Sequence, residues 1–267
     1  MYNETIEKIS NASISKASLL KNNKKIYFVS SMFAGSFIGL GVIISSTVGG
    51  LLTAGNSPFT KLIMGLAFSI ALISVIFTGT ELFTGNNFVM AIGRFNKKIK
   101  TSDLISVWLV SWVGNLLGAI ILSYIFVSTG LIDKGPVMDF FANAALSKAT
   151  IAPLALIARA ILCNFIVCLA VLLCFRTDDD VAKILLMAIC LFAFVASGFE
   201  HSIANMTAFS IALFAKSIHT ITVIQAVYAL LMATIGNIIG GALFLGIGVF
   251  AMKNSFKKPR IDRFPIL

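Results

Sequence analysis

Charged residues are scarce in this sequence. Asp, Glu, Lys and Arg together make up 12% of the 267 residues, about half the share found in soluble domains. Hydrophobic residues make up 58%, and they gather in runs close to the ~20 residues that a helix needs to cross a bilayer. The composition therefore excludes an ordinary soluble domain and predicts a membrane protein that crosses the bilayer several times.

Metal-binding and redox-active residues are also few. The chain has two histidines and four cysteines, and the cysteines lie inside or at the ends of apolar runs without the paired short spacings of a zinc site. We therefore expect neither a metal nor another cofactor. The thiols are expected to be buried and unreactive: Cys163, Cys168, Cys174 and Cys190.

The N-terminal region lacks a long apolar core. Residues 1–25 therefore do not resemble a cleaved signal peptide. They place apolar side chains at helical spacing beside lysines, which predicts an amphipathic helix at the membrane surface.

Six apolar segments follow this region. We expect membrane spans over Ile26–Leu52, Leu62–Thr80 continuing to about Ile92, Leu104–Thr129, Ala149–Phe175, Val181–Ser197 continuing to about Phe214, and Ile221–Met252. The predicted organisation is an N-terminal segment (1–25), a first transmembrane repeat (26–130), an extracytoplasmic connection (131–148), a second repeat (149–252) and a C-terminal tail (253–267).

Lysine and arginine are distributed unequally between the two sides. Sixteen of the 21 lie in the terminal segments or in the second and fourth loops, and the other side has only Lys61, Lys134, Lys148 and Lys216. Positively charged loops stay in the cytoplasm, so we expect both termini to be cytoplasmic, in the inner (plasma) membrane. The net charge of +10 then reflects topology, and nucleic-acid binding is not expected.

Two motifs occur twice in the same order. Thr78–Asn86 and Ser197–Asn205 both read [S/T]-G-x-E-x4-N, and G-N-x-x-G follows at Gly114–Gly118 and Gly236–Gly240. Three spans per half is an odd number, so the halves must insert with opposite orientation. The predicted fold is an all-α membrane protein with six helices in a 3+3 inverted repeat, and the first motif breaks the second and fifth helices.

The motifs place polar groups at membrane depth. Half-helix N-termini at two breaks present N–H groups and a positive dipole end, which favour an anion. Glu81 and Glu200 are either a proton relay or, as their symmetry favours, structural groups that accept N–H bonds and fasten the breaks. In the structural interpretation they form a network with four amides: Asn86, Asn115, Asn205 and Asn237.

His201 breaks the symmetry of the repeat, because Leu82 occupies the matching position. Histidine changes charge near neutral pH, so His201 is a candidate to exchange a proton with a weak acid; a satisfied core histidine is the alternative. The Thr84 hydroxyl is expected to bond a passing anion or His201, or only to cap the next half-helix. Lys148 either snorkels to the surface or attracts anions to the pore mouth.

At these motifs the sequence resembles the formate/nitrite transporter family, and the likeness covers nearly the whole chain. The resemblance implies homopentamers in which each protomer has an aquaporin-like pore. It also implies that His201 is the central pore histidine, Thr84 its partner and Lys148 the electropositive residue near the vestibule. Apolar constrictions around a central chamber are implied at Phe68, Leu72, Leu82, Val167 and Phe194.

Within that family the overall likeness is greatest to the hydrosulfide channel branch. The predicted function is a membrane channel for small monovalent weak-acid anions, with hydrosulfide first and formate or nitrite next. The anion passes either as a neutral acid, after taking a proton directly or through His201, or as a partly solvated ion. A proton-coupled formate or nitrite transporter is the alternative, and an enzyme is not expected because no activated nucleophile is visible.

Overall fold

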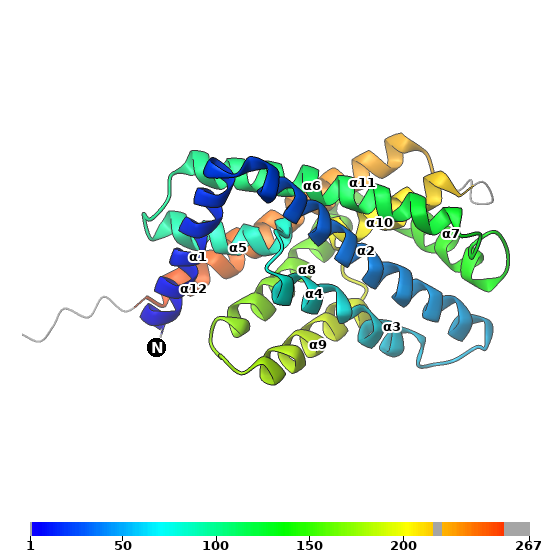
Figure 1. Ribbon diagram of the computed structural model, residues 1–267. Coiled ribbons are helices and arrows are strands. Elements are labelled where there is room, and N and C mark those ends of the chain that lie inside the picture. The colour runs from blue at the N-terminus through cyan, green and yellow to red at the C-terminus, as the bar shows by residue number, and fades with distance from the viewer. Residues whose placement is uncertain (1, 216–220, 254–267) are drawn as a thin grey trace, which may run out of the picture.

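The computed structural model describes residues 2–215 and 221–253, and these residues form helices joined by short connections (Figure 1). Lys216 and residues 254–267 of the predicted tail lie outside the described part. The first half contains α1 (Tyr2–Asn22), α2 (Lys24–Ala54), α3 (Thr60–Phe68), α4 (Ile70–Thr78), α5 (Phe83–Phe95) and α6 (Thr101–Ser128). The second contains α7 (Pro136–Ala149), α8 (Pro153–Cys174), α9 (Asp180–Ala196), α10 (Ser202–Phe214), α11 (Val223–Ile238), the π-helical segment η1 (Ile239–Ile247) and α12 (Gly248–Ala251).

The predicted six-span, all-helical fold is confirmed. Five stretches among the described residues are each long and apolar enough to cross a membrane: α2, α3–α4, α6, α8 and the continuous stretch from α11 to α12. The remaining span consists of α9, with 17 residues, and α10, with 13. Neither half is long enough to cross alone, as expected of a broken helix.

A glycine ends the helix at each break. Gly79 follows α4 with φ 66° and Gly198 follows α9 with φ 73°, a left-handed conformation that a side chain disfavours. The chain then runs extended through Leu82 and His201, the residues immediately before α5 and α10. The first motif therefore contains both the helix stop and the start of the next half-helix.

The connection predicted over residues 131–148 contains a helix, α7, that was not predicted from the sequence. Gly135, with φ 86°, and Pro136 at the first helical position set its start. Lys148 lies in its last turn. Helices α1 and α7 each precede one repeat, and they lie at opposite ends of the molecule (Figure 1).

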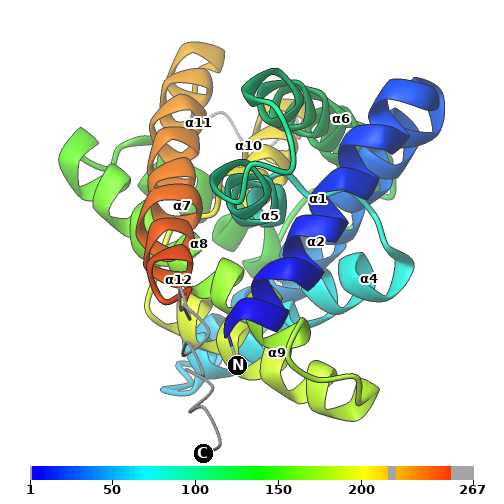
Figure 2. The ribbon, with the colours of Figure 1, turned by 90° about the vertical axis from the view of Figure 1, so that its left-hand side faces the viewer.

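Glycines bring the long helices of each half into close contact. A Cβ atom at Gly35 or Gly118 would overlap the facing backbone in the α2–α6 pair, and one at Gly236 or Gly240 would overlap the backbone of α8. Small residues permit this approach in membrane helices. Figure 2 shows the result: α5 and α10 lie among the other helices of the bundle, and most of their residues are buried.

Candidate pore and its two helix breaks

The side chain of Asn115 in α6 fastens the first break. Its Oδ1 accepts the N–H of Phe83 at 2.9 Å, and its Nδ2 donates to the carbonyl oxygens of Ser31 (2.7 Å) and Glu81 (3.0 Å). Asn115 is fully buried, so its amide replaces backbone partners that the interrupted helix lacks. The start of α5 is thereby tied to α2 and α6.

Asn237 in α11 makes the same three bonds at the second break. Its Oδ1 accepts the N–H of Ser202 at 2.8 Å, and its Nδ2 donates to the carbonyl oxygens of Ala160 (2.8 Å) and Glu200 (3.0 Å). The asparagines of the two G-N-x-x-G motifs are therefore equivalent in space. These bonds relate α2 to α8, α5 to α10, and α6 to α11.

Each break also contains a buried carboxylate. Glu81 Oε2 accepts hydrogen bonds from Lys16 Nζ (2.8 Å), Asn86 Nδ2 (3.0 Å) and the Tyr27 hydroxyl (3.1 Å). Asn86 Nδ2 also donates to the Tyr27 hydroxyl oxygen at 3.1 Å. Lys16 comes from α1, so the helix that precedes the first repeat supplies the cation for the first break.

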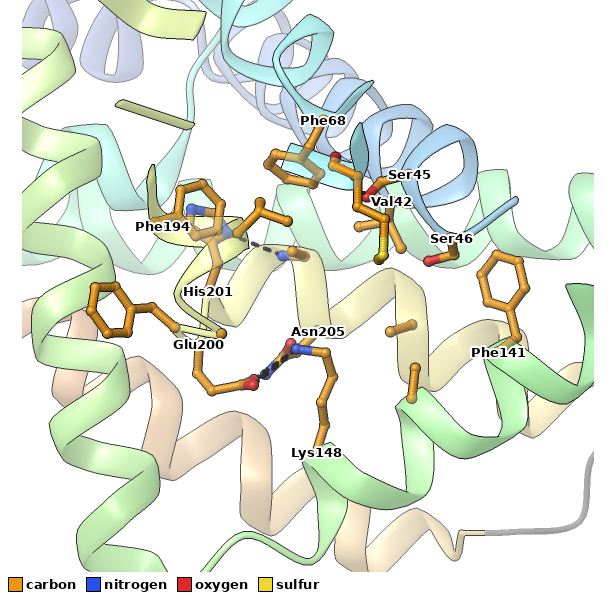
Figure 3. Close-up of a pocket in the computed structure, with 17 residues that line it drawn as sticks. Val42, Ser45, Ser46, Phe68, Phe141, Lys148, Phe194, Glu200, His201 and Asn205 are labelled. Atoms are coloured by element: carbon orange, nitrogen blue, oxygen red, sulfur yellow. Dashed lines mark hydrogen bonds and ion pairs between the residues drawn. The ribbon is translucent and has the colours of Figure 1, made fainter. Parts of the chain in front are cut away.

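The carboxylate of the second break is bound in the same manner. Lys148 Nζ lies 3.0 and 2.9 Å from the two carboxylate oxygens of Glu200, and Asn205 Nδ2 donates to Oε2 at 2.8 Å (Figure 3). Here the cation comes from α7. Leu156 stands where the first repeat has Tyr27, since each lies four residues before the carbonyl that the motif asparagine bonds. The second network therefore lacks the phenol.

The four motif amides divide into two kinds. Asn86 and Asn205 donate N–H bonds to the carboxylates, as do Lys16 and Lys148, whereas Asn115 and Asn237 bind the backbone. The role of Lys16 was not predicted from the sequence, where this lysine counted only toward the membrane topology. The signal available in the sequence was its position in a helix that precedes the first repeat.

His201 is buried and held in one tautomer. Its Nδ1 accepts the N–H of Ala204 at 3.1 Å, and its Nε2 lies 3.0 Å from Thr84 Oγ1. Since a backbone N–H only donates, Nδ1 carries no proton, and the Nε2–H of the neutral ring donates to the Thr84 hydroxyl. A proton on Nδ1 would break the bond that caps α10.

Three rings lie in a row beside the second break. Phe194 stacks on His201 with ring centroids 6.0 Å apart, and Phe68 meets Phe194 edge to face at 5.4 Å (Figure 3). Both phenyl rings are buried. Apolar surface therefore lies directly against the imidazole, where a charged solute would lose most of its hydration.

Two cavities lie on either side of this region. The α7 cavity has a volume of about 160 Å³, and its lining includes Phe68, Lys148, Phe194, Glu200 and His201. The α1 cavity has a volume of about 130 Å³, and its lining includes Lys16, Leu72, Leu82, Asn86 and Val171. The two share no lining residue among those described, so buried side chains separate them, and each contains the lysine of one Lys–Glu pair.

The constriction positions implied by the family resemblance are distributed over these cavities. Phe68 and Phe194 line the α7 cavity, and Leu72 and Leu82 line the α1 cavity. Val167 is buried in α8 and lines neither.

A larger cavity of about 660 Å³ adjoins the α7 cavity, and we call it the α7 vestibule. The two share Lys148 and Glu200 in their linings, so they lie next to each other on either side of this pair. Lys61 and Arg159 also line the vestibule, and neither forms an ion pair with another described residue. Glu200 is already paired with Lys148, so the vestibule carries uncompensated positive charge, which attracts anions.

A polar pair in α8 supports Thr84, which lines neither cavity. Asn164 Nδ2 donates to the carbonyl oxygens of Thr84 (3.3 Å) and Asn237 (2.7 Å) and to Asn87 Oδ1 (3.1 Å), and Cys168 Sγ lies 3.3 Å from the Thr84 carbonyl oxygen. Asn164 was not predicted as a site residue. The signal available in the sequence was a polar amide in the middle of an apolar run.

Comparison with known proteins identifies related sequences along the whole chain. A family model described as Formate/nitrite transporter matches residues 3–251. The chain is 36% identical over 265 residues to the nitrite transporter NirC of Escherichia coli (strain K12), covering 99% of this chain and 97% of that protein. It is also 36% identical over 234 residues to a probable formate transporter of Methanothermobacter thermautotrophicus, covering 81% and 85% of the two chains.

Two solved structures have the same fold. One, described as an FNT family ion channel, superposes with a TM-score of 0.89 at 34% identity and covers 94% of this chain and 100% of its own. The other, described as a pentameric formate channel with formate bound, has a TM-score of 0.74 at 30% identity and covers 84% and 95%.

Proposed function

The chain belongs to the formate/nitrite transporter family, and from this premise we propose that it is a channel for small monovalent weak-acid anions. Hydrosulfide is the first candidate, from the overall likeness of the sequence, and formate and nitrite are the next. The names of the relatives, a nitrite transporter and a probable formate transporter, support the substrate class. The observation that carries the proposal is that a lysine lies in the cavity on each side of one apolar barrier.

The charges of the α7 vestibule begin the proposed path. Lys61 and Arg159 draw the anion in, and Lys148 meets it where the vestibule joins the α7 cavity. Beyond that point stand Phe68 and Phe194, against which a bare charge is costly. An anion of a weak acid avoids this penalty by taking a proton and crossing as the neutral acid.

The proposed proton comes from the bulk solution and reaches the anion through water in the vestibule. His201 has no free acceptor, because Nδ1 is occupied by the Ala204 N–H. It therefore serves as a neutral hydrogen-bonding group between apolar walls, oriented by Thr84. After the barrier the acid enters the α1 cavity, where Lys16 stabilises the anion as the proton leaves. Passage of the partly solvated ion is the rival mechanism.

We propose a homopentamer in the inner membrane with both termini in the cytoplasm. A related solved structure is described as pentameric, and the lysine and arginine distribution supports a cytoplasmic position for both ends of the chain. The proposed organisation keeps residues 1–25 as a surface segment, 26–130 and 149–252 as the repeats, and 131–148 as the extracytoplasmic connection that carries α7.

A proton-coupled transporter is the second candidate. A coupled transporter would use the same Lys–Glu pairs as a channel. The two differ in whether a proton gradient can drive the substrate above its equilibrium level. An enzyme at Glu81, Glu200 and His201 has no support, because the family consists of transporters.

The first test is flux into liposomes that contain the purified protein. Hydrosulfide, formate, nitrite and chloride are compared between pH 5 and 8, with empty liposomes as the control for direct permeation of the acids. We expect saturable entry of the three weak-acid anions and exclusion of chloride. Accumulation of formate above its equilibrium level, driven by an imposed pH gradient, would identify the coupled transporter instead.

A further inference from the structure

Another cavity with basic side chains lies away from the pore, where the end of α1 and the start of α2 meet the start of α6. Its volume is about 500 Å³. We call it the lysine groove, and it is lined by Ala17, Leu20, Lys21, Lys24, Phe28, Asp103, Ser106 and Val110. None of these residues lines the α1 or α7 cavity.

The groove lies at the level where two membrane spans begin. Lys24 is the first residue of α2, and Asp103 is the third residue of α6. Farther into these spans the surface becomes apolar, with Val113 44% and Leu117 38% exposed on α6. Polar groups thus lie at headgroup depth, and apolar groups lie where acyl chains are.

The groove carries a net positive charge, because its lining contains two lysines and one aspartate. Lys21 and Lys24 are exposed, and neither forms an ion pair with another described residue. Asp103 Oδ2 accepts the backbone N–H of Lys100 at 2.9 Å, so it already caps α6. Two ammonium groups and the Ser106 side chain therefore face an apolar floor of Leu20, Phe28 and Val110.

We propose that the lysine groove binds the phosphate headgroup of an anionic glycerophospholipid. The phosphate matches the two lysines in charge, and the glycerol and first methylenes match the apolar floor. Lysines at the membrane surface attract anionic lipids, each by about 1 kcal/mol, which is about fivefold in affinity. A zwitterionic lipid brings its own cation and gains much less.

A lipid in this groove would act on the pore through α1. Ala17, Leu20 and Lys21 of α1 line the groove, and the neighbouring Lys16 reaches Glu81 at the first break. Headgroup binding therefore favours the docked position of α1 that keeps Lys16 on its carboxylate. This effect does not depend on which anion the channel conducts.

The test titrates the delipidated full-length protein in detergent with phosphatidylglycerol or phosphatidylcholine of identical acyl chains. Native mass spectrometry counts the lipids bound per protomer. We expect phosphatidylglycerol to bind with clear preference and the double variant Lys21→Gln/Lys24→Gln to bind it about 30-fold more weakly, about fivefold per lysine. An unchanged affinity in that variant would overturn the proposal.

Two further variants separate a built groove from general surface charge. Lys25→Gln/Lys97→Gln removes the same charge from exposed positions that do not line the groove, and it should bind phosphatidylglycerol as the native chain does. Ser106→Trp fills the groove and keeps both lysines, and it should lose the preferred lipid. Equal losses in both double variants, or full binding by Ser106→Trp, would show surface attraction only.

A second copy of the chain is the competing occupant of the groove. If the lysine pair contacts a neighbouring protomer, Lys21→Gln/Lys24→Gln changes the oligomeric mass and leaves phosphatidylglycerol binding intact. That result overturns the lipid proposal and leaves the proposed channel function untouched.

Discussion

Thr84 and His201 are 117 residues apart in the chain, and their side chains meet at 3.0 Å. Thr84 lies in the first turn of α5 and His201 directly before α10, so this contact joins the two inverted halves at their breaks. The repeat supplies no second copy of it, because Leu82 and Ile203 occupy the equivalent positions. The two repeats therefore differ at His201 and Thr84, beside the phenyl ring of Phe194.

Replacing His201 by Asn tests where the proton comes from. We expect formate flux to fall about tenfold, since one hydrogen-bonding group worth about 1.4 kcal/mol is lost. Its dependence on pH should stay as in the native protein if, as proposed, the proton comes from the bulk solution and not from His201. Stopped-flow entry of formate between pH 5 and 8 measures both quantities, and a flat pH profile in the variant would assign the proton transfer to His201.

Thr84→Val removes the acceptor of the imidazole Nε2–H. A buried donor left without a partner costs about 1–3 kcal/mol, so we expect a lower melting temperature and slower flux. Thr84→Ser should retain both properties. Thr78→Val, at an exposed position of α4, is the control. Native flux and stability in Thr84→Val would show that the contact does not hold the ring.

Lys16 and Glu81 should show strong energetic coupling. Lys16→Met leaves a buried carboxylate without its cation, and we expect a loss of about 2–3 kcal/mol of stability, below the range for fully buried pairs because the lysine side chain is 22% exposed. Lys16→Met/Glu81→Gln should recover most of that loss. Thermal unfolding of the four proteins in the double-mutant cycle measures the coupling.

The matched control for this cycle is Lys8→Met. Lys8 and Glu4 form an exposed pair, with side chains 45% and 78% exposed, and such pairs contribute at most about 1 kcal/mol. Additive losses for Lys16→Met and Glu81→Gln would mean that the buried pair contributes no coupling energy.

The fold could be predicted from the sequence because the same motifs occur in both halves and indicate the same helix break in each. Gly79 and Gly198 mark both helix stops, and the odd number of spans per half gives the inversion. Helix α7 escaped prediction because it is short and mixes apolar with charged residues, so it gives no clear span signal. The helix starts at Gly135 and Pro136, and a Gly-Pro pair is equally typical of a loop, so it did not indicate a helix.

The bonding within the candidate site was harder to predict. The positions of the motif amides can be read from the repeat, but the partners cannot, because they come from other elements. Lys16 reaches a carboxylate 65 residues away, and Asn164 bonds groups 73 to 80 residues away. Asn164 also has no polar counterpart in the first half, where the equivalent position of α2 is Gly35. Only tertiary packing identifies such residues.

Acid should loosen the contact between α1 and the α5–α6 connection. Asn96 Nδ2 donates to Glu7 Oε1 at 3.0 Å, and Lys98 Nζ lies 3.3 Å from Glu7 Oε2. The Asn96 bond first, and then Lys98, hold the pKa of the Glu7 carboxyl below its ordinary value of 4.5. Because the pKa of Glu7 is lower when α1 is docked, ionised Glu7 stabilises docking above pH 4.5. This stabilisation is lost as the pH falls through the lowered pKa of Glu7 in the docked helix.

Hydrogen exchange of α1 between pH 3.5 and 7, corrected for the intrinsic rates, measures this effect. We expect protection of residues 2–12 to fall below about pH 4.5. In Glu7→Gln the protection should vary less with pH over that interval. Glu4→Gln, at a more exposed position of the same helix, is the control and should behave like the native chain. Identical profiles in Glu7→Gln and the native chain would exclude Glu7 as the group responsible.

Chloride distinguishes neutral passage from passage of the ion, because no proton neutralises chloride between pH 5 and 8. If the barrier formed by Phe68 and Phe194 excludes ions through lost hydration, a wider barrier that admits water should admit chloride. We therefore expect Phe194→Ala to conduct chloride at least tenfold faster than the native channel, with weaker dependence of formate flux on pH. Phe33→Ala, on the exposed surface of α2 (55% exposed), should conduct neither faster nor slower.

Phe194→Ala also removes a buried ring and costs about 3–5 kcal/mol of stability, so Phe194→Leu serves as the milder variant and should show a smaller increase in the same direction. Patch recording from the same liposomes separates chloride current from leak, because the native and Phe33→Ala proteins provide the baseline. Chloride conduction by the native channel at the rate of formate would show that the apolar row does not require a neutral solute. The role of the two lysines would then be to solvate the ion, since an ion that never takes a proton needs a countercharge on each side of the barrier.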